Sequence, residues 1–367
     1  MKEPRIIISG GGTGGHIFPA ISIAKAIKEI YPEAQLLFVG AKGKMEMEKV
    51  PAAGFEIVGL PVAGFHRKLT ARNLLFPFKL MASLMKARGV IKKFKPQVAV
   101  GVGGYASGPV LRIASQSGIP CLLQEQNSYP GVTNRLLAQK SAKICVAYDQ
   151  MERFFPAQKI LVTGNPVRND LLCDISKADA AQFWGLDATK KTILVIGGSL
   201  GARSVNQGVL AGLKELTDDV QIIWQTGRFY FEEMKSKLPA AVAKRVIVTD
   251  FISRMDMAFS MADLVVSRAG ASSISELAIL GKATLFVPSP NVSEDHQTKN
   301  AMALVEKGAA KLLKDADVAA IIATATELLK DDNQLAGLSA NIRQFARPDA
   351  ARDIAQEVIK LIKESSK

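Results

Sequence analysis

A histidine and a run of glycines form the segment of this sequence with the clearest chemical potential. Residues Gly10–His16 read Gly-Gly-Gly-Thr-Gly-Gly-His and follow a short apolar run. Glycine lets the backbone approach a ligand closely, and the N-terminus of a following helix favours negative charge. The segment therefore predicts a site for an anionic group, with the imidazole of His16 beside it as a side chain that titrates near neutral pH.

Similar loops recur later in the chain. Gly101–Pro109 follows another apolar run, and Gly197–Arg203 opens the second half of the sequence. A shorter turn, Gln225–Gly227, follows a further run. One such loop is commonly only a tight connection. Several glycine-rich loops at predicted strand-to-helix junctions indicate an anionic ligand. It is expected at the carboxyl ends of the strands, where doubly wound sheets bind their ligands.

The first loop also satisfies the dinucleotide-binding pattern G-x-G-x-x-G through Gly10, Gly12 and Gly15. That pattern alone is weakly specific, and NAD binding also needs an acidic residue after the second strand to hold the ribose. Here the apolar run 36–39 is followed by glycine, alanine and lysine. The sequence therefore disfavours an NAD-dependent oxidoreductase.

A serine-rich segment, Ser267–Glu276, offers hydroxyl groups and a carboxylate at another predicted helix start. Its N–H groups and hydroxyls suit a phosphate, and Glu276 suits the hydroxyls of a ribose. The alternative is a capping box of Ser273 and Glu276, which needs no ligand. The polar turn Glu294–Asn300 leaves the same choice, between contacts to a sugar and an ordinary solvated loop.

Short apolar runs alternate with helical patterns along the whole chain. Near-continuous Ile, Val and Leu runs in such an alternation predict parallel sheets covered by helices on both faces. The runs are residues 5–9, 36–39, 98–102, 121–124, 144–147, 160–162, 192–196, 221–225, 246–249, 264–267 and 284–287. Each half begins with a strand, a glycine loop and a helix. We therefore expect an α/β protein of two doubly wound, Rossmann-like domains with a cleft between them.

The domain boundary is expected near residue 165, where an Asn-Pro pair disfavours helix and marks a turn. We assign residues 1–165 to an N-terminal domain and residues 166–345 to a C-terminal domain. In the remaining segment, 346–367, apolar residues recur on one face of a helix predicted over 349–363.

The net charge of +13 lies entirely in the first 166 residues. Between Glu56 and Glu125 no acidic residue occurs, whereas ten Lys and Arg do, partly interleaved with large apolar side chains. Basic groups attract anionic headgroups and apolar groups enter the interface, so the stretch predicts contact with a membrane surface. We place that contact on Phe65, Arg67, Lys68, Arg72, Leu75, Phe76, Phe78 and Lys79. The simpler alternative is a helix with a solvated basic face. Nucleic acid is disfavoured because no RNA-binding or helix-turn-helix motif occurs.

Composition excludes several other classes. The 367 residues are 48% apolar and 22% charged, which suits folded domains, and no apolar stretch approaches the roughly 18 residues of a membrane span. The N-terminal residues lack a signal-peptide pattern, and Cys121, Cys145 and Cys173 have no metal-like spacing, so we expect a cytosolic protein with reduced thiols. Asp315 and Asp317 match the D-x-D metal–diphosphate signature but lie far from every glycine loop. We expect an exposed helix start there, and neither a bound metal nor a cofactor.

Eight motifs are distinctive together. They are GGTGGHIFPA (11–20), GGYASGP (103–109), QEQNSYPGVTNR (124–135), TGNPVR (163–168), GGSLGARSVN (197–206), QTG (225–227), SRAGASSISEL (267–277) and DHQTKNA (295–301). In this order the chain resembles, over essentially its whole length, the MurG family of bacterial N-acetylglucosaminyltransferases. The resemblance implies a GT-B fold whose C-terminal helix packs back on the N-terminal domain. It also implies transfer of GlcNAc from UDP-GlcNAc to the C4 hydroxyl of undecaprenyl-diphospho-MurNAc-pentapeptide (lipid I), with inversion, to give lipid II for peptidoglycan.

The resemblance also implies which residues bind the substrates, with the uracil edge at the Ile252 backbone and the ribose at Glu276. The implied UDP-GlcNAc contacts are Thr13, Gly14, Gly15, Asn127, Arg168, Ser199, Ile252, Ala271, Ser272, Glu276 and Gln297. The acceptor diphosphate is expected at Gly12, Gly104 and Tyr105. The expected location is peripheral, on the anionic cytoplasmic face of the bacterial inner membrane. Other proteins of cell-wall synthesis are candidate partners.

An inverting displacement needs a general base for the acceptor hydroxyl. His16 is the first candidate, and its alternative role is a structural bond to the loop; Glu125 is the rival base. Some family members carry histidine where this chain has Gln124, so residue 124 is not expected to be an essential base. Some carry glutamine where this chain has His296, which leaves the sugar contact at that position open.

Alternatives from other classes lead to different expectations. Another GT-B lipid glycosyltransferase, such as one acting on diacylglycerol, would share the basic and apolar surface. A UDP-GlcNAc 2-epimerase would have no use for that surface. A non-catalytic, membrane-docking UDP-sugar sensor would bind UDP-GlcNAc without turnover, so tests with defined acceptors separate these functions.

Overall fold

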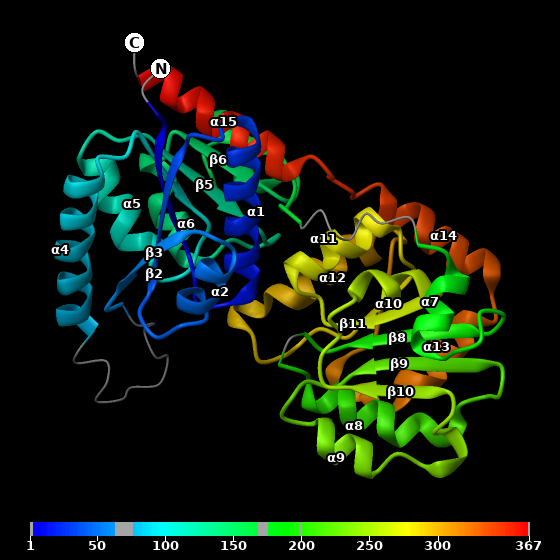
Figure 1. Ribbon diagram of the computed structural model, residues 1–367. Coiled ribbons are helices and arrows are strands. Elements are labelled where there is room, and N and C mark those ends of the chain that lie inside the picture. Colours follow the sequence, from blue (N-terminus) through cyan, green and yellow to red (C-terminus); the bar gives the residue numbers. More distant parts are fainter. Residues whose placement is uncertain (1–2, 63–75, 168–174, 199, 366–367) are drawn as a thin grey trace. The chain divides into compact units, whose positions relative to one another are not determined.

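A computed structural model describes residues 3–62, 76–167, 175–198 and 200–365 (Figure 1). Contacts divide the chain into two compact units, one of residues Met1–Arg168 with Arg347–Lys367 and the other of Asn169–Ala346. Each unit is built on one parallel sheet with helices between its strands, which confirms the predicted α/β class.

The first unit has a seven-stranded sheet in the order β3-β2-β1-β4-β5-β6-β7. Its strands are β1 (Arg5–Ser9), β2 (Gln35–Ala41), β3 (Glu56–Leu60), β4 (Val98–Gly101), β5 (Cys121–Glu125), β6 (Lys143–Val146) and β7 (Ile160–Val162). Its α-helices are α1 (Gly14–Ile30), α2 (Glu46–Ala52), α4 (Phe76–Phe94), α5 (Ser107–Gln116), α6 (Val132–Leu137) and α15 (Ala350–Ser365). All neighbouring strands pair in parallel.

Alternate residues of β1 enter separate cores on the two faces of this sheet. Ile6 and Ile8 pack in a cluster with apolar residues of α1 and α15, whereas Ile7 packs in one with residues of α4 and α5. All three side chains are fully buried. A strand buried on both faces must be apolar at every position, which explains the uninterrupted Ile run in the sequence.

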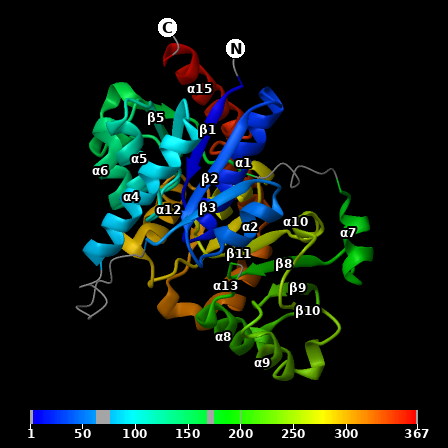
Figure 2. The same cartoon turned by 60° about the vertical axis from the view of Figure 1, so that its left-hand side comes forward.

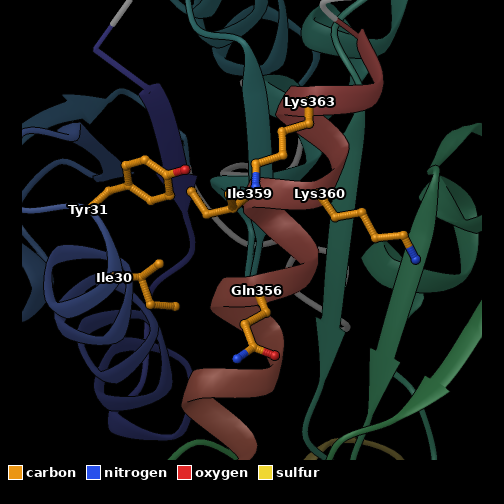
Figure 3. Close-up of a pocket in the computed structure, with 6 residues that line it drawn as sticks. All are labelled: Ile30, Tyr31, Gln356, Ile359, Lys360 and Lys363. Atoms are coloured by element: carbon orange, nitrogen blue, oxygen red, sulfur yellow. The ribbon is translucent and has the colours of Figure 1, made fainter. Parts of the chain in front are cut away.

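Helix α15 returns to the first unit at the end of the chain. Its buried residues Ile354, Val358 and Ile362 recur at helical spacing and join the core beside α1. Figure 3 shows Ile359 reaching from α15 toward Tyr31, which follows α1, at a cavity of about 440 Å³. Burial of this apolar face is what fixes α15 to a unit that is distant in the sequence.

The second unit has a six-stranded parallel sheet in the order β10-β9-β8-β11-β12-β13. Its strands are β8 (Lys191–Ile196), β9 (Val220–Gln225), β10 (Val246–Thr249), β11 (Leu264–Ser267), β12 (Thr284–Phe286) and β13 (Lys311–Leu312). Its α-helices are α7 (Lys177–Trp184), α8 (Arg203–Gly212), α9 (Phe231–Ser236), α10 (Met255–Met261), α11 (Ala271–Leu280), α12 (His296–Val305), α13 (Ile321–Leu329) and α14 (Asp332–Arg343), and a 3₁₀ helix, η8, spans Asp315–Ala320.

Strand order reverses once in each sheet, between β1 and β4 in the first and between β8 and β11 in the second. In doubly wound folds the connections that follow two such strands leave in opposite directions, and ligands bind at the carboxyl ends of the strands at this point. Figure 2 shows the second sheet from another side, with β8 and β11 labelled; α8 and α11 follow these two strands in the chain. The predicted glycine loops follow β1, β4 and β8, and the serine-rich segment follows β11.

Candidate active site

The first glycine loop and the loop after β4 meet at the reversal point of the first sheet. A Cβ atom added to Gly104 would lie 2.2 Å from the carbonyl oxygen of Gly11, and Gly104 has a φ of +83°. Both the contact and the left-handed backbone demand glycine. The Ser107 hydroxyl ties the two loops further, since it lies 2.9 Å from the Ser9 carbonyl oxygen and 2.8 Å from that of Gly103.

His16 lies in the first turn of α1, half-buried, against the second of these loops. Its Nδ1 is 3.0 Å from Thr13 Oγ1. A Cβ atom at Gly103 would come within 2.9 Å of His16 Nε2 and Cδ2, so the imidazole packs directly on the Gly103 backbone. In the tautomer that carries its hydrogen on Nδ1, the ring donates to Thr13 and keeps Nε2 as a proton acceptor.

A buried carboxylate that the sequence analysis missed holds the first glycine loop. Glu46, the first residue of α2, is fully buried. Its Oε2 accepts from the Gly12 N–H at 3.1 Å and its Oε1 from the Ala41 N–H at 2.9 Å. Cβ atoms at Gly11 and Gly40 would lie 2.0 Å and 2.6 Å from this side chain. The glycines of the first loop therefore make room for Glu46 as well as for a ligand.

Glu125, at the end of β5, is almost fully buried, and hydrogen bonds occupy both its oxygens. Oε1 accepts from the N–H and the Nδ2 of Asn127, at 3.0 and 3.2 Å. Oε2 accepts from Asn134 Nδ2 at 2.8 Å and from the Gly131 N–H at 3.2 Å. Burial raises the pKa of the Glu125 carboxyl, while these four bonds act in the opposite direction. The contacts make Glu125 the anchor of the loop that carries Asn127.

Two glutamines beside Glu125 belong to a buried amide network. Gln124 Nε2 donates to Asn165 Oδ1 at 3.0 Å, and Asn165 Nδ2 donates to the Gln126 carbonyl at 3.0 Å. Gln126 Nε2 donates to the Val102 carbonyl at 2.8 Å. The network joins the ends of β4 and β5 to the segment after β7, and in it Gln124 links backbone segments.

The loops after β8 and β9 approach each other closely in the second unit. A Cβ atom at Gly201 would lie 1.9 Å from the Thr226 carbonyl oxygen, and Gly201 has a φ of +77°. Gln225, at the end of β9, donates through Nε2 to the Gly198 carbonyl at 3.1 Å and accepts from the Ile252 N–H at 2.9 Å. The N–H of the residue expected at the uracil edge is therefore bonded to Gln225.

Helix α11 begins at Ala271, with Gly270 as its N-cap and no side-chain capping bond. The capping box of Ser273 and Glu276 is therefore wrong as the alternative explanation of this segment. The Oγ of Ser272 is buried and has no hydrogen-bond partner among the described residues. The first N–H groups of a helix have no acceptor within the helix, so together with this hydroxyl they suit an anionic group.

The polar turn before α12 is held in a strained conformation. Glu294 and Asp295 have φ angles of 56° and 51°, and two consecutive non-glycine residues in this region are rare. Gln297, in the first turn of α12, accepts from the Ser289 N–H at 2.9 Å. This bond joins the start of α12 to the segment that follows β12.

Comparison with known proteins gives the family. Residues 6–146 match the glycosyltransferase family 28 N-terminal domain, and residues 192–357 match the glycosyltransferase family 28 C-terminal domain. A Parabacteroides distasonis protein, 57% identical over 99% of both chains, is named UDP-N-acetylglucosamine--N-acetylmuramyl-(pentapeptide) pyrophosphoryl-undecaprenol N-acetylglucosamine transferase. A crystal structure of Acinetobacter baumannii MurG, 30% identical, matches with a TM-score of 0.79 over 97% of this chain and 99% of that one. The chain belongs to the MurG family of glycosyltransferases.

Membership of the MurG family confirms the predicted GT-B fold and the enzyme class. A putative UDP-N-acetylglucosamine 2-epimerase from Listeria monocytogenes also matches, with a TM-score of 0.71 over 100% of this chain and 98% of that one. Its sequence is only 14% identical, so it shares the fold alone. The full-length identity to a named transferase therefore decides against the epimerase alternative.

Of the residues that the MurG resemblance implies as donor contacts, Thr13, Gly14 and Gly15 follow β1, and Ala271, Ser272 and Glu276 follow β11. In the first unit Thr13 and Gly15 are exposed, and Gly14 and Asn127 are half-buried. Of the acceptor residues, Gly12 and Tyr105 are exposed. Arg168 and Ser199 lie outside the described residues. Within the described ranges, no group of three or more His, Cys, Asp and Glu residues is arranged to hold a metal ion.

Helix α4 carries the described part of the basic and apolar stretch. Phe78, Met81 and Met85 share one face and are 73%, 59% and 63% exposed. Around them, the exposed basic residues of this helix are Lys79, Lys86, Arg88, Lys92 and Lys93. Phe65, Arg67, Lys68, Arg72 and Leu75 lie outside the described residues, as does the side chain of Phe76. No helix in the part of the chain that the structure describes is long and apolar enough to span a membrane.

Proposed function

We propose that this chain transfers GlcNAc from UDP-GlcNAc to the C4 hydroxyl of lipid I, with inversion, and so forms lipid II. The observation that carries the proposal is the 57% identity, over 99% of both chains, to a relative that bears this transferase name. The glycine loops and open helix start at the two reversal points support it, because both substrates carry a diphosphate.

The second unit supplies the donor site in this proposal. The first turn of α11 offers its N–H groups and the Ser272 hydroxyl to the diphosphate of UDP, on which negative charge builds as the glycosidic bond breaks. Glu276, one turn further along α11, accepts from the ribose hydroxyls. Because the N–H of Ile252 bonds to Gln225, the uracil contact falls to the rest of the Ile252 backbone. Gln297 binds the sugar from the first turn of α12.

The first unit supplies the acceptor site and the base. His16 Nε2 takes the proton of the C4 hydroxyl, the hydroxyl oxygen bonds to the anomeric carbon, and UDP leaves with the electrons of the broken bond. Nδ1 then carries its hydrogen toward Thr13 Oγ1, 3.0 Å away, which fixes the tautomer and the ring orientation. The exposed loop residues Gly12 and Tyr105, with Gly104, bind the acceptor diphosphate.

Glu125 acts as a positioning residue and not as the base. Four donors already occupy its oxygens, and the side chain is only 2% exposed. Proton transfer needs a base within hydrogen-bond reach of the substrate hydroxyl. The half-buried imidazole of His16 meets that condition better, and Glu125 holds Asn127 for the donor.

A transfer assay tests the function. The protein is incubated with radiolabelled UDP-GlcNAc and either a short-chain lipid I analogue or diacylglycerol, with and without EDTA. We expect label only in the lipid I product, unchanged by EDTA. Transfer to diacylglycerol would favour another lipid glycosyltransferase, and UDP-GlcNAc binding without transfer to any acceptor would favour a sensor.

The same assay separates the two candidate bases. We expect His16→Gln to lower kcat by about 100-fold or more, because general base catalysis contributes roughly 10²–10⁴-fold. Glu125→Gln should lower kcat less and leave the pH dependence of the residual activity unchanged. A larger loss of kcat in Glu125→Gln than in His16→Gln would reverse the assignment.

We further propose that α4 docks the enzyme on the anionic cytoplasmic face of the inner membrane. Phe78, Met81 and Met85 enter the headgroup region, and the surrounding Lys and Arg side chains pair with anionic lipids. Vesicle sedimentation at low and high salt tests this. We expect Phe78→Ser to weaken binding to phosphatidylglycerol vesicles about tenfold, whereas Phe183→Ser, at an exposed aromatic of α7, should leave it unchanged. Equal binding by both variants would refute the docking face.

A further inference from the structure

The D-x-D match at Asp315 has a partner that the sequence did not indicate. Asp315 Oδ1 lies 2.6 Å from Nη1 of Arg268, the residue directly after β11. The Asp315 side chain is 20% exposed and that of Arg268 is 12% exposed. The expected exposed helix start is therefore wrong for Asp315, since its carboxylate is turned inward onto a guanidinium. Asp317, two residues later in η8, is exposed.

The Arg268 guanidinium joins several segments at the reversal point of the second sheet. Nη1 also donates to the carbonyl oxygens of Val287 and Pro288, at 2.9 and 3.1 Å, just beyond β12. Nη2 donates to Ser204 Oγ at 2.7 Å, in the first turn of α8. The Ser204 hydroxyl in turn donates to Asp315 Oδ1 at 2.7 Å. Asp315 Oδ1 thus accepts hydrogen bonds from both the Arg268 guanidinium and the Ser204 hydroxyl, and it holds the two groups together.

These segments carry the residues of the proposed donor site. Arg268 stands three residues before Ala271, where α11 begins, and Pro288 precedes Ser289, whose N–H is bonded to Gln297. Helix α8 follows the Gly197–Ala202 loop. Tight packing holds η8 in place, because a Cβ atom at Gly208 of α8 would lie 2.2 Å from the Val318 carbonyl oxygen. The Asp315 carboxylate therefore lies on a segment that is held firmly against α8.

We propose that Asp315 is a positioning residue for nucleotide binding. By neutralising and orienting Arg268 and Ser204, it keeps the start of α8, the start of α11 and the segment after β12 in one arrangement. Without the Asp315 charge, the largely buried guanidinium of Arg268 is left without a counter-charge, which is unfavourable in free energy. The guanidinium then turns toward solvent and releases its bonds to Val287 and Pro288. This inference rests on the proposed function, because it assigns UDP to these segments.

Calorimetric titration with UDP tests the inference in the full chain. Asp315→Asn should weaken UDP binding about tenfold, the size expected for loss of one charge-assisted hydrogen bond. Asp317→Asn, which makes the same charge change in the same helix, should bind UDP like the wild type. In turnover, Asp315→Asn should raise KM for UDP-GlcNAc by a similar factor and leave KM for the lipid I analogue unchanged.

The outcomes separate this inference from the function on which it rests. Loss of thermal stability in Asp315→Asn with unchanged UDP affinity would show a merely structural role and overturn the inference alone. Absence of UDP binding in the wild type would overturn the donor-site proposal and the inference with it. If Asp315→Asn does not fold, Ser204→Ala removes only the hydroxyl and should weaken UDP binding about threefold; unchanged affinity there would equally overturn the inference.

Discussion

Replacement of Glu46 by glutamine tests whether one buried carboxylate organises the first glycine loop. Glu46 is fully buried and accepts one N–H on each oxygen, from Gly12 and from Ala41. Glutamine keeps only one acceptor oxygen and turns an NH₂ group toward the other N–H. The Ala41 bond is buried and the Gly12 bond is only partly buried, so we expect the amide oxygen to stay with Ala41. Gly12 then faces a donor and moves.

The expected cost follows from that count of bonds. A buried or partly buried N–H without its acceptor costs about 1–3 kcal/mol, and Glu46→Gln leaves one such group. The same displacement moves the loop on which His16 and the acceptor site depend. A misplacement of about 1 Å can cost roughly 100-fold in rate, so we expect kcat/KM for the lipid I analogue to fall between tenfold and about 100-fold.

Urea unfolding, followed by two signals, measures the stability change. Both tryptophans of the sequence, Trp184 and Trp224, lie in the second unit, so their fluorescence reports on that unit, whereas far-UV circular dichroism reports on both. Glu46→Gln should shift the circular dichroism transition to lower urea. Glu48→Gln, at an exposed position of the same helix, is the matched control. If the two variants unfold at the same urea concentration and turn over equally, Glu46 does not hold the loop.

Two further predictions concern the other glycine loop and the buried Glu125. Gly201→Ala places a Cβ atom 1.9 Å from the Thr226 carbonyl, whereas Gly198→Ala, with a similar φ of +87°, meets nothing within 4 Å. Gly198→Ala should therefore lower the free energy of unfolding by only about 1–2 kcal/mol, through backbone strain. Gly201→Ala should lower it by about 1–3 kcal/mol more, through overpacking, and should also weaken UDP binding. Equal unfolding midpoints of the two variants would contradict the close approach of these loops. Burial raises the pKa of Glu125 in the folded protein, so its stabilising contribution is complete below the pKa of the unfolded chain and is lost as pH rises through the folded value. The stability of the wild type relative to Glu125→Gln should accordingly decrease as pH rises from about 4 toward neutrality. Thermal unfolding of both proteins at several pH values measures this difference, and an increase of the difference with pH would contradict the prediction.

The strands were predictable because their signal is local. β1, β7, β10 and β11 have the predicted bounds, and most others differ by a residue or two at an end. Two edge strands were missed. β3 contains a glutamate and a glycine and is buried only at its last two residues, and β13 has two residues. Edge position alone does not explain this, since β7 and β10 are also edge strands and consist of uninterrupted or nearly uninterrupted apolar runs. β3 and β13 were missed because neither contains a continuous apolar run long enough to be distinguished from a loop.

The hydrogen-bond partners of polar side chains were not predictable from the amino-acid sequence. Glu46 and Glu48 both read as ordinary acids in the first turn of a helix, and only the fold turns one toward the Gly12 N–H and the other toward water. Asp315 and Asp317 differ in the same way, since β11 brings Arg268 beside the first alone. For Glu125, the motif correctly drew attention to the residue, but four donors from the following loop and helix define its surroundings.

The sequence by itself determined the α/β class, the glycine loops at strand ends, the uneven charge and the family, because these depend on composition, periodicity and the order of motifs along the chain. The tertiary structure decided which carboxylates hold the loops, where the Ile252 N–H is used and what Asp315 contacts. Three of the bonds join residues that are 27 to 47 apart in the sequence and that only the tertiary fold brings together, namely Glu46 with Gly12, Ile252 with Gln225 and Asp315 with Arg268. The donors to Glu125 are nearer, within nine residues, but the turn of the chain after β5 decides that they meet its carboxylate. Burial then removes water as a competitor, so that the hydrogen bonds of each side chain fix its role.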